Sequence, residues 1–111
     1  MKRFFLLWFL SMAILHVSAY DFEVDRIYYN ILPDGLSVEV TVGDEKYNVY
    51  GDQADIVIPE KVVYNGKQYT VTAIGSIAFY QCGDMGTIDL PATINTFGSS
   101  AFSGCYFKKV F

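Results

Sequence analysis

Two cysteines end two copies of the same nine-residue phrase. The phrase reads "IGSIAFYQC" over residues 74–82 and "FGSSAFSGC" over residues 97–105. Cys82 and Cys105 could act as nucleophiles, bind a metal, form a disulfide with each other, or pack as buried thiols. A reactive thiol needs solvent exposure and a pKa depressed by a nearby cation or a helix N-terminus. The choice among these depends on the elements that position the two residues.

The phrase is an internal repeat whose period is the step from Ile74 to Phe97. Five of its nine positions are identical in the two copies, and a sixth exchanges Ile74 for Phe97. A fixed period of this size is typical of solenoid architectures. The identical pairs are Gly75 and Gly98, Ser76 and Ser99, Ala78 and Ala101, Phe79 and Phe102, and Cys82 and Cys105.

An earlier coil precedes these two phrases. "IDLP" (88–91) has a counterpart in "IVIP" (56–59), and the step between their two prolines is longer than the period. Asn65-Gly66 between β-forming residues is the signature of a type I′ hairpin, and such a hairpin accounts for the excess. We therefore predict leucine-rich-repeat coils over residues 56–111, with a hairpin insertion at 63–71.

The preceding residues, 20–55, are predicted to form a β-hairpin leader that caps the repeats at their N-terminal end. "FEVDRIYYNIL" (22–32) and "LSVEVTV" (36–42) have strand patterns. Pro-Asp-Gly at 33–35 joins them with residues that favour a turn. A further strand is expected around 46–50.

The chain resembles the BspA-like family of leucine-rich-repeat proteins, which many anaerobic bacteria export. The resemblance implies a β-rich solenoid in which each short coil has a strand and a short helical turn. It also implies a role in adhesion, or in binding host and neighbouring-cell proteins. The matching residues are Met85, Ile88, Leu90, Pro91, Ile94, Phe97, Gly98, Ala101, Phe102 and Cys105, with Ile74, Gly75, Ala78, Phe79 and Cys82 in the preceding repeat.

The strand of each coil separates core residues from partner-binding residues. Side chains alternate along a strand, so Ile88 points inward while Thr87 and Asp89 point outward. Asp55 and Val57 occupy the same outward positions one coil earlier. These four outward residues are the predicted partner-binding face.

The short helical turn is predicted to bury the cysteines. Gly98 lets the chain turn sharply, Ser99 caps the turn, and Cys105 shares a helical face with Ala101 and Phe102. Phe79 is expected to lie over Phe102 in an aromatic column. Buried structural thiols are therefore the first interpretation of Cys82 and Cys105. A disulfide between adjacent coils is the alternative, because stacking could bring their Cα atoms near the required distance of about 4.4–6.8 Å.

Residues 1–19 have the pattern of a cleaved signal peptide. Lys2 and Arg3 precede an apolar run over 4–15, and Val17-Ser18-Ala19 supplies small residues for cleavage. The apolar run is short for a membrane span, which takes about 20 residues. We therefore expect an exported protein, secreted or at the cell surface, with no membrane span after cleavage.

Cleavage would leave an acidic chain without histidine. The whole chain has eight Lys and Arg and twelve Asp and Glu, and Lys2 and Arg3 would leave with the signal peptide, so six cations would face twelve anions. The resulting charge of −6 disfavours nucleic acid and anionic lipid as partners. His16 would also leave, and two cysteines alone do not make a zinc site. We expect no metal and no cofactor.

Tyrosines and acids of the leader offer two further binding hypotheses. Tyrosine has an apolar ring and a polar tip, which suits protein or glycan contact, but β-propensity and cross-strand packing are the preferred explanation of these residues. The acids Asp44, Glu45, Asp52 and Asp55 lack the spacing of a calcium loop and are predicted to be solvated. The tyrosines are Tyr28, Tyr29, Tyr47, Tyr50, Tyr64 and Tyr69.

No catalytic motif is present, so the sequence predicts a non-enzymatic protein. The family resemblance implies that it acts in adhesion or binds a protein of a host or neighbouring-cell surface. Two alternatives remain open. One is an N-terminal capping fragment of a longer repeat protein, without binding activity of its own. The other is a glycan-binding module that uses the leader tyrosines.

Overall fold

The computed structural model describes residues 20–43, 50, 55–80 and 82–110. The predicted signal peptide, most of the strand expected at 46–50, and Asp44, Glu45 and Asp52 lie outside these residues. The described residues form strands and turns and contain no helix, so no helix among them could cross a membrane. The strands are β1 (Phe22–Val24), β2 (Ile27–Ile31), β3 (Ser37–Thr41), β4 (Asp55–Val57), β5 (Lys61–Tyr64), β6 (Lys67–Ile74), β7 (Gly83–Asp89), β8 (Thr96–Phe97) and β9 (Cys105–Val110).

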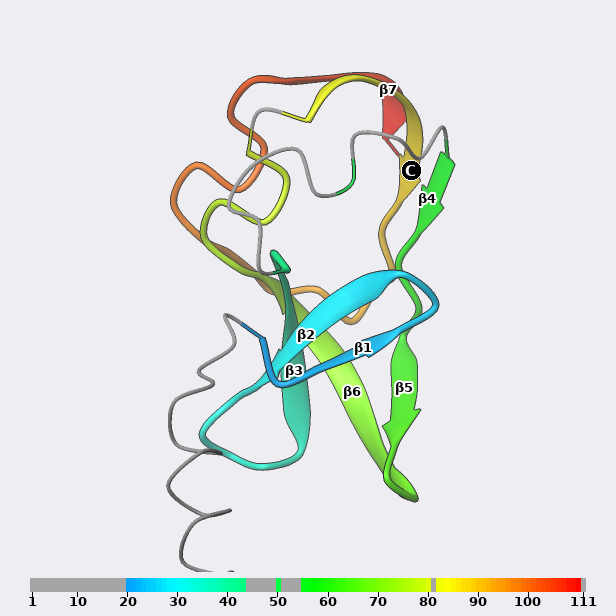
Figure 1. The fold of residues 1–111 in the computed structure, drawn as a ribbon, viewed down its shortest axis with the longest axis vertical. Helices are drawn as coiled ribbons and strands as arrows, with labels where there is room; N and C mark the ends of the chain where they lie inside the picture. Colours follow the sequence, from blue (N-terminus) through cyan, green and yellow to red (C-terminus); the bar gives the residue numbers. More distant parts are fainter. Residues whose placement is uncertain (1–19, 44–49, 51–54, 81, 111) are drawn as a thin grey trace, which may run out of the picture.

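The strands form two sheets (Figure 1). The larger has the order β1-β2-β3-β6-β5, with β8 also paired to β6, and the smaller has the order β4-β7-β9. Within them, two parallel ladders repeat along the chain: β3, β6 and β8 form one, and β4, β7 and β9 form the other. Each coil therefore contributes one strand to each ladder. This strand-rich repeat architecture confirms the predicted β-solenoid.

The register of the ladders follows the repeat. Thr87 pairs with Lys109, close to one period later, whereas Asp55 pairs with Thr87 across a longer interval. The β5–β6 hairpin lies inside the longer interval. Its turn residues have positive φ, 51° at Asn65 and 75° at Gly66, as a type I′ turn requires. The additional residues of this interval thus form a hairpin outside the β4–β7 ladder, and β4 still pairs with β7.

The leader differs from its predicted single hairpin. The expected strand over 22–32 is broken at Asp25 and Arg26, where φ is 52° and 68°. The break makes a tight antiparallel hairpin of β1 and β2. β2 then pairs with β3 across the Pro-Asp-Gly turn, as the sequence predicts. β3 in turn pairs in parallel with β6, so the last leader strand is the first rung of a solenoid ladder.

The predicted short helical turn is wrong. Residues 76–80 and 99–104 form turns, and φ is 56° at both Ile77 and Ser100, which interrupts any right-handed helix. The physical reason lies in hydrogen bonds between coils. The Ile77 amide donates to the Ser99 carbonyl at 3.1 Å, and the Phe79 amide donates to the Ala101 carbonyl at 2.8 Å. These amides are therefore unavailable for the i→i−4 bonds of a helix.

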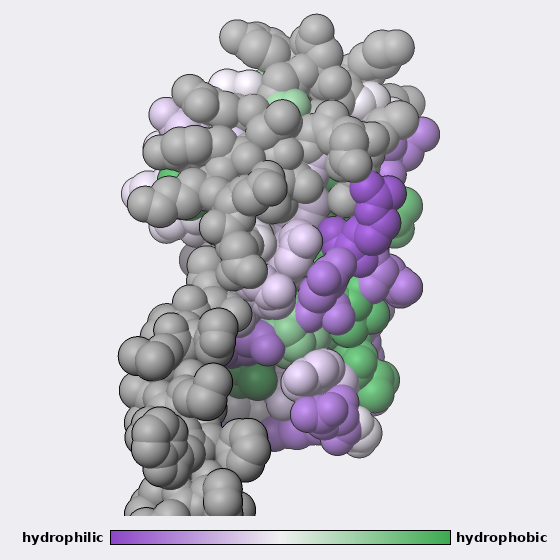
Figure 2. All heavy atoms as spheres, viewed as in Figure 1, coloured by the Kyte–Doolittle hydropathy of each residue, from purple (hydrophilic) through white to green (hydrophobic). Residues whose placement is uncertain are grey.

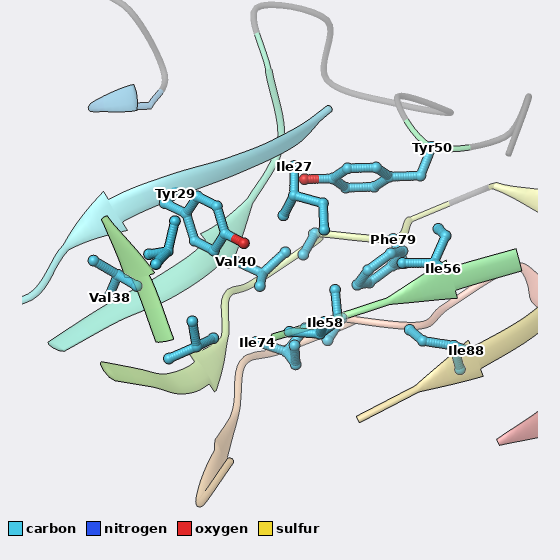
Figure 3. Packing of buried hydrophobic residues seen from close by; sticks show 14 of the residues in the cluster. Ile27, Tyr29, Val38, Val40, Tyr50, Ile56, Ile58, Ile74, Phe79 and Ile88 are labelled. Carbon is cyan, nitrogen blue, oxygen red and sulfur yellow. The ribbon is translucent and has the colours of Figure 1, made fainter. Parts of the chain in front are cut away.

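The predicted aromatic column is present and extends into the leader. The Phe79 and Phe102 rings stack, with centroids 5.3 Å apart and an interplanar angle of 8°. Tyr50 covers the other side of Phe79 at 4.8 Å, and Figure 3 shows the two rings side by side. Phe79 is fully buried, and Ile56 and Ile88 are buried beside it as strand alternation predicts. The core is therefore continuous from the leader through both coils.

The glycines of the repeated phrase allow close contact between coils. Neither Gly75 nor Gly98 has positive φ. The sharp turn predicted at Gly98 therefore does not explain why glycine occupies this position. A Cβ on Gly98 would lie 2.3 Å from the Ser76 nitrogen, and one on Gly75 would lie 2.9 Å from the Val40 carbonyl oxygen. Each glycine instead lets one coil's backbone touch the preceding strand.

We predict that Gly98→Ala destabilises the protein more than Gly66→Ala does. At Gly98 the added methyl group collides with fixed backbone, which costs about 3 kcal/mol. At Gly66 nothing lies within 4 Å, so only the positive φ of 75° opposes alanine, at about 1–2 kcal/mol. Urea unfolding followed by circular dichroism measures both losses. Equal losses would show that the coils can move apart to accept a side chain.

Candidate functional site

The two cysteines lie at the ends of successive coils, against the core. Cys82 is buried, with 4% of its surface exposed, and Cys105 is half-buried. Neither forms a disulfide in the structure. The Sγ atom of Cys105 donates to the Phe79 carbonyl, and that of Cys82 lies 3.9 Å from the Tyr80 carbonyl. Cys82 is therefore buried and Cys105 only partly so, and a turn rather than a helix positions both.

Burial makes Cys82 a poor nucleophile. Loss of solvent, with a smaller contribution from the neighbouring Cys105 thiol, raises the pKa of its thiol to about 12. A catalytic cysteine requires the opposite shift, because the thiolate is the reactive form. Within the described ranges, no group of three His, Cys, Asp or Glu side chains is arranged to hold a metal ion.

We predict that the protein loses stability in alkali. Burial also raises the pKa of Tyr29 to about 12, with Asp25 adding to the effect, and raises the pKa of Tyr50. A raised pKa means that the folded state keeps a proton that the unfolded chain releases. The stabilisation is complete below the unfolded pKa, about 8.5 for Cys and 10 for Tyr, and is lost as pH rises through the folded values.

Urea unfolding between about pH 8 and pH 11 measures this loss. Cysteine titrates before tyrosine in an unfolded chain, so Cys82→Ala is expected to flatten the decline between about pH 8.5 and 10. The slope is compared rather than the absolute stability, because the substitution also removes a buried sulfur. An unchanged slope would mean that the Cys82 thiol does not stay protonated in the folded state.

The four predicted outward residues lie together on the β4–β7 ladder. Asp55 pairs with Thr87, and Val57 pairs with Asp89. The Thr87 hydroxyl donates to the Asp55 carboxylate at 2.7 Å, so this first row is joined across the ladder. Asp55, Val57 and Asp89 are exposed, and Thr87 is half-exposed. We call these four residues the outer face.

A shallow groove adjoins the outer face at Val57. It has a volume of about 360 Å³ and runs between the β1–β2 turn, the chain after β4, and β5. Val57 and Val63 are 65% and 59% exposed, and Figure 2 shows hydrophobic side chains gathered on the side where β4 and β5 lie. The groove is lined by Val24, Asp25, Ile27, Tyr29, Val57, Pro59, Lys61, Val62 and Val63.

Sequence reasoning missed the groove residues of the hairpins. The alternation within β5 places Val62 inward and Val63 outward, which was a usable signal. The position of β5 opposite the β1–β2 turn was not predictable, because β1 and β2 were taken as one strand. Only the folded chain brings these elements together.

Most of the leader tyrosines are core residues. Tyr29, Tyr50 and Tyr69 are buried, Tyr28 is half-buried, and Tyr47 lies outside the described residues. The Tyr50 hydroxyl donates to the Thr41 carbonyl and accepts from the Tyr28 amide at 3.1 Å. Tyr64 is 37% exposed and stacks on Phe22 with ring centroids 4.4 Å apart. The described tyrosines therefore do not form an exposed row of rings for a glycan.

Comparison with known proteins decides the family of the repeats. Residues 60–111 match the family model described as "BspA type Leucine rich repeat region (6 copies)". This part of the chain is therefore similar to the BspA-type leucine-rich-repeat family. The resemblance that was based on the repeated phrase is thereby confirmed. No match was found among the curated proteins.

Solved structures of leucine-rich-repeat proteins have the same fold as this chain. A protein from Bacteroides capillosus ATCC 29799 is 26% identical with a TM-score of 0.66, over 80% of this chain and 62% of that one. One from Bacteroides ovatus ATCC 8483 is 24% identical with a TM-score of 0.57, over 80% and 34%. A leucine rich cell surface protein from Faecalibacterium prausnitzii A2-165 is 15% identical with a TM-score of 0.50, over 86% and 32%. The chain thus spans less than two thirds of each of these proteins.

Proposed function

We propose that this chain is an exported, non-enzymatic protein that binds another protein at a host or neighbouring-cell surface. The observation that carries the proposal is the outer face. The exposed side chains of Val57 and Asp89 point away from the core that stacks the coils, so their identity is free to serve a partner. Val57 and Asp89 are both exposed and lie side by side on adjacent strands, which combines apolar area with charge.

The groove gives the outer face an apolar extension. Val57 belongs to both, and Val63 continues the exposed apolar surface onto β5. Asp25 and Lys61 place opposite charges in the groove lining. A partner with apolar side chains and a few charges of both signs suits this surface, because interfaces combine an apolar centre with polar contacts that fix orientation.

Export is supported by the signal-peptide pattern of residues 1–19 and by one structural neighbour described as a cell surface protein. A non-enzymatic role is supported by the raised pKa of the Cys82 thiol. It is also supported by the lack of a metal-binding cluster among the described residues.

A second function, that of an N-terminal capping unit, is favoured by two observations. The order β4-β7-β9 puts β9 at the edge of the smaller sheet within the described part of the chain. The chain also spans only 62% and 34% of the two Bacteroides proteins. As a capping unit the chain would cover one end of a longer repeat array and have no binding activity of its own.

Binding of the labelled chain to intact cells tests the proposal. The purified chain is titrated onto epithelial cells and onto bacterial cells, before and after their surface proteins are removed with trypsin. We expect saturable binding that trypsin abolishes. Thr87→Lys with Asp89→Lys is expected to weaken binding by at least about tenfold, or ~1.4 kcal/mol, by placing repulsive charge on the outer face.

Glu23→Lys with Ser99→Lys, at exposed positions outside the outer face and the groove lining, adds the same charge and is the matched control. Binding that survives trypsin but is lost after glycosidase treatment would favour a glycan ligand instead. The absence of saturable binding on either cell type would favour the capping unit. Equal weakening by the control and the outer-face variant would place the binding surface elsewhere.

A further inference from the structure

We propose that Cys82 and Cys105 close a disulfide between two successive coils, and that exchange with an external disulfide enters at Cys105. The proposal concerns a covalent modification of the core and does not depend on the binding function. It requires only an oxidant of the small-molecule disulfide class, such as oxidised glutathione. Disulfides of this kind persist in compartments outside the cytosol.

The backbone brings the two cysteines together. The Phe79 carbonyl accepts from the Cys82 amide at 3.3 Å and also from the Sγ of Cys105. Gly83, which directly follows Cys82, is the register partner of Cys105 in the β7–β9 ladder. Parallel neighbours are about 4.8 Å apart and successive residues about 3.3 Å, so the cysteine Cα atoms are roughly 6 Å apart, within the range for a disulfide.

The two thiols also lie close together. The Cys105 thiol contributes to the raised pKa of Cys82, and its Sγ donates to the same Phe79 carbonyl that accepts from the Cys82 amide. The neighbouring Phe79–Phe102 stack holds the two coils at a fixed spacing, with ring centroids 5.3 Å apart. Bridging therefore needs a rotation of side chains rather than a movement of coils.

Exposure sets the order of the steps. Cys105 is half-buried, whereas Cys82 is buried and its protonated thiol is a weak nucleophile. Cys105 loses its proton and attacks one sulfur of the external disulfide, forming a mixed disulfide and releasing one external thiol. Cys82 then loses its proton and attacks the Cys105 sulfur, releasing the second external thiol. Two protein thiols are oxidised and one external disulfide is reduced.

Intact-mass measurement of the purified chain after incubation with oxidised glutathione tests the proposal. We expect the wild-type chain to become lighter by two hydrogen atoms, with its urea midpoint raised because a closed loop restricts the unfolded chain. Cys82→Ser is expected to stop at a glutathione adduct on Cys105. Cys105→Ser is expected to stay unmodified while folded. In urea, both single variants should form adducts at similar rates.

Several results would overturn the proposal. A wild-type chain that stays a dithiol, or stops at the adduct, would mean that the two sulfurs do not meet. Equal adduct rates in the two folded variants would contradict entry at Cys105. Because serine at a buried position can unfold the chain, Cys82→Ala is measured in parallel, with circular dichroism to confirm that each variant is folded.

Discussion

The stacking of Phe79 between Tyr50 and Phe102 is the interaction on which the rest of the structure depends. Tyr50 belongs to the leader, Phe79 to one coil and Phe102 to the next, so a single column of rings passes through three parts of the chain. The Tyr50 hydroxyl also donates to the Thr41 carbonyl, which fastens the column to β3. Without its neighbours, each coil would expose an apolar side to water, because a repeat unit cannot bury its own hydrophobic face.

The column is possible only because the coils approach to strand spacing. Gly98 donates its amide to the Ile74 carbonyl at 2.8 Å, and Gly75 donates to the Val40 carbonyl at 2.7 Å. A side chain at Gly98 would meet backbone atoms of Gly75 and Ser76 in the preceding coil, and one at Gly75 would meet the Val40 carbonyl oxygen of β3. The resulting separation of the rings, 5.3 Å, is close to the ~4.8 Å between neighbouring strands, so backbone pairing and ring stacking reinforce one another.

The same stacking divides the side chains into those that the core needs and those that are free to contact a partner. Ile56, Ile88 and Phe79 are committed to the core, and changing them disturbs every coil. Val57 and Asp89 point away from it and can change without cost to the stacking. The cysteines lie at the boundary between these two groups, since Cys82 faces the core while Cys105 is half-exposed. Coil spacing therefore decides both the position of the binding surface and the distance between the thiols.

Local sequence patterns were enough to predict the repeat and the Asn65-Gly66 turn. They also predicted that Ile88 points inward and Asp89 outward, and that Phe79 stacks on Phe102. These depend on side-chain alternation, the φ preferences of single residues and a periodic pattern, all of which are visible in a short window. The tight turn at Asp25-Arg26 was hidden because neither residue is a glycine or asparagine that signals positive φ. The groove, which depends on that turn, was hidden with it.

Only the tertiary structure decided the geometry of the turns and the role of the leader. Ile77 adopts positive φ in a turn whose amides donate to carbonyls of the next coil. β3 becomes a rung of the solenoid because β6 pairs with it in parallel. Both outcomes depend on backbone hydrogen bonds between residues that are far apart in the sequence. No local pattern records such bonds, because every residue type offers the same backbone donor and acceptor, with proline alone lacking the donor.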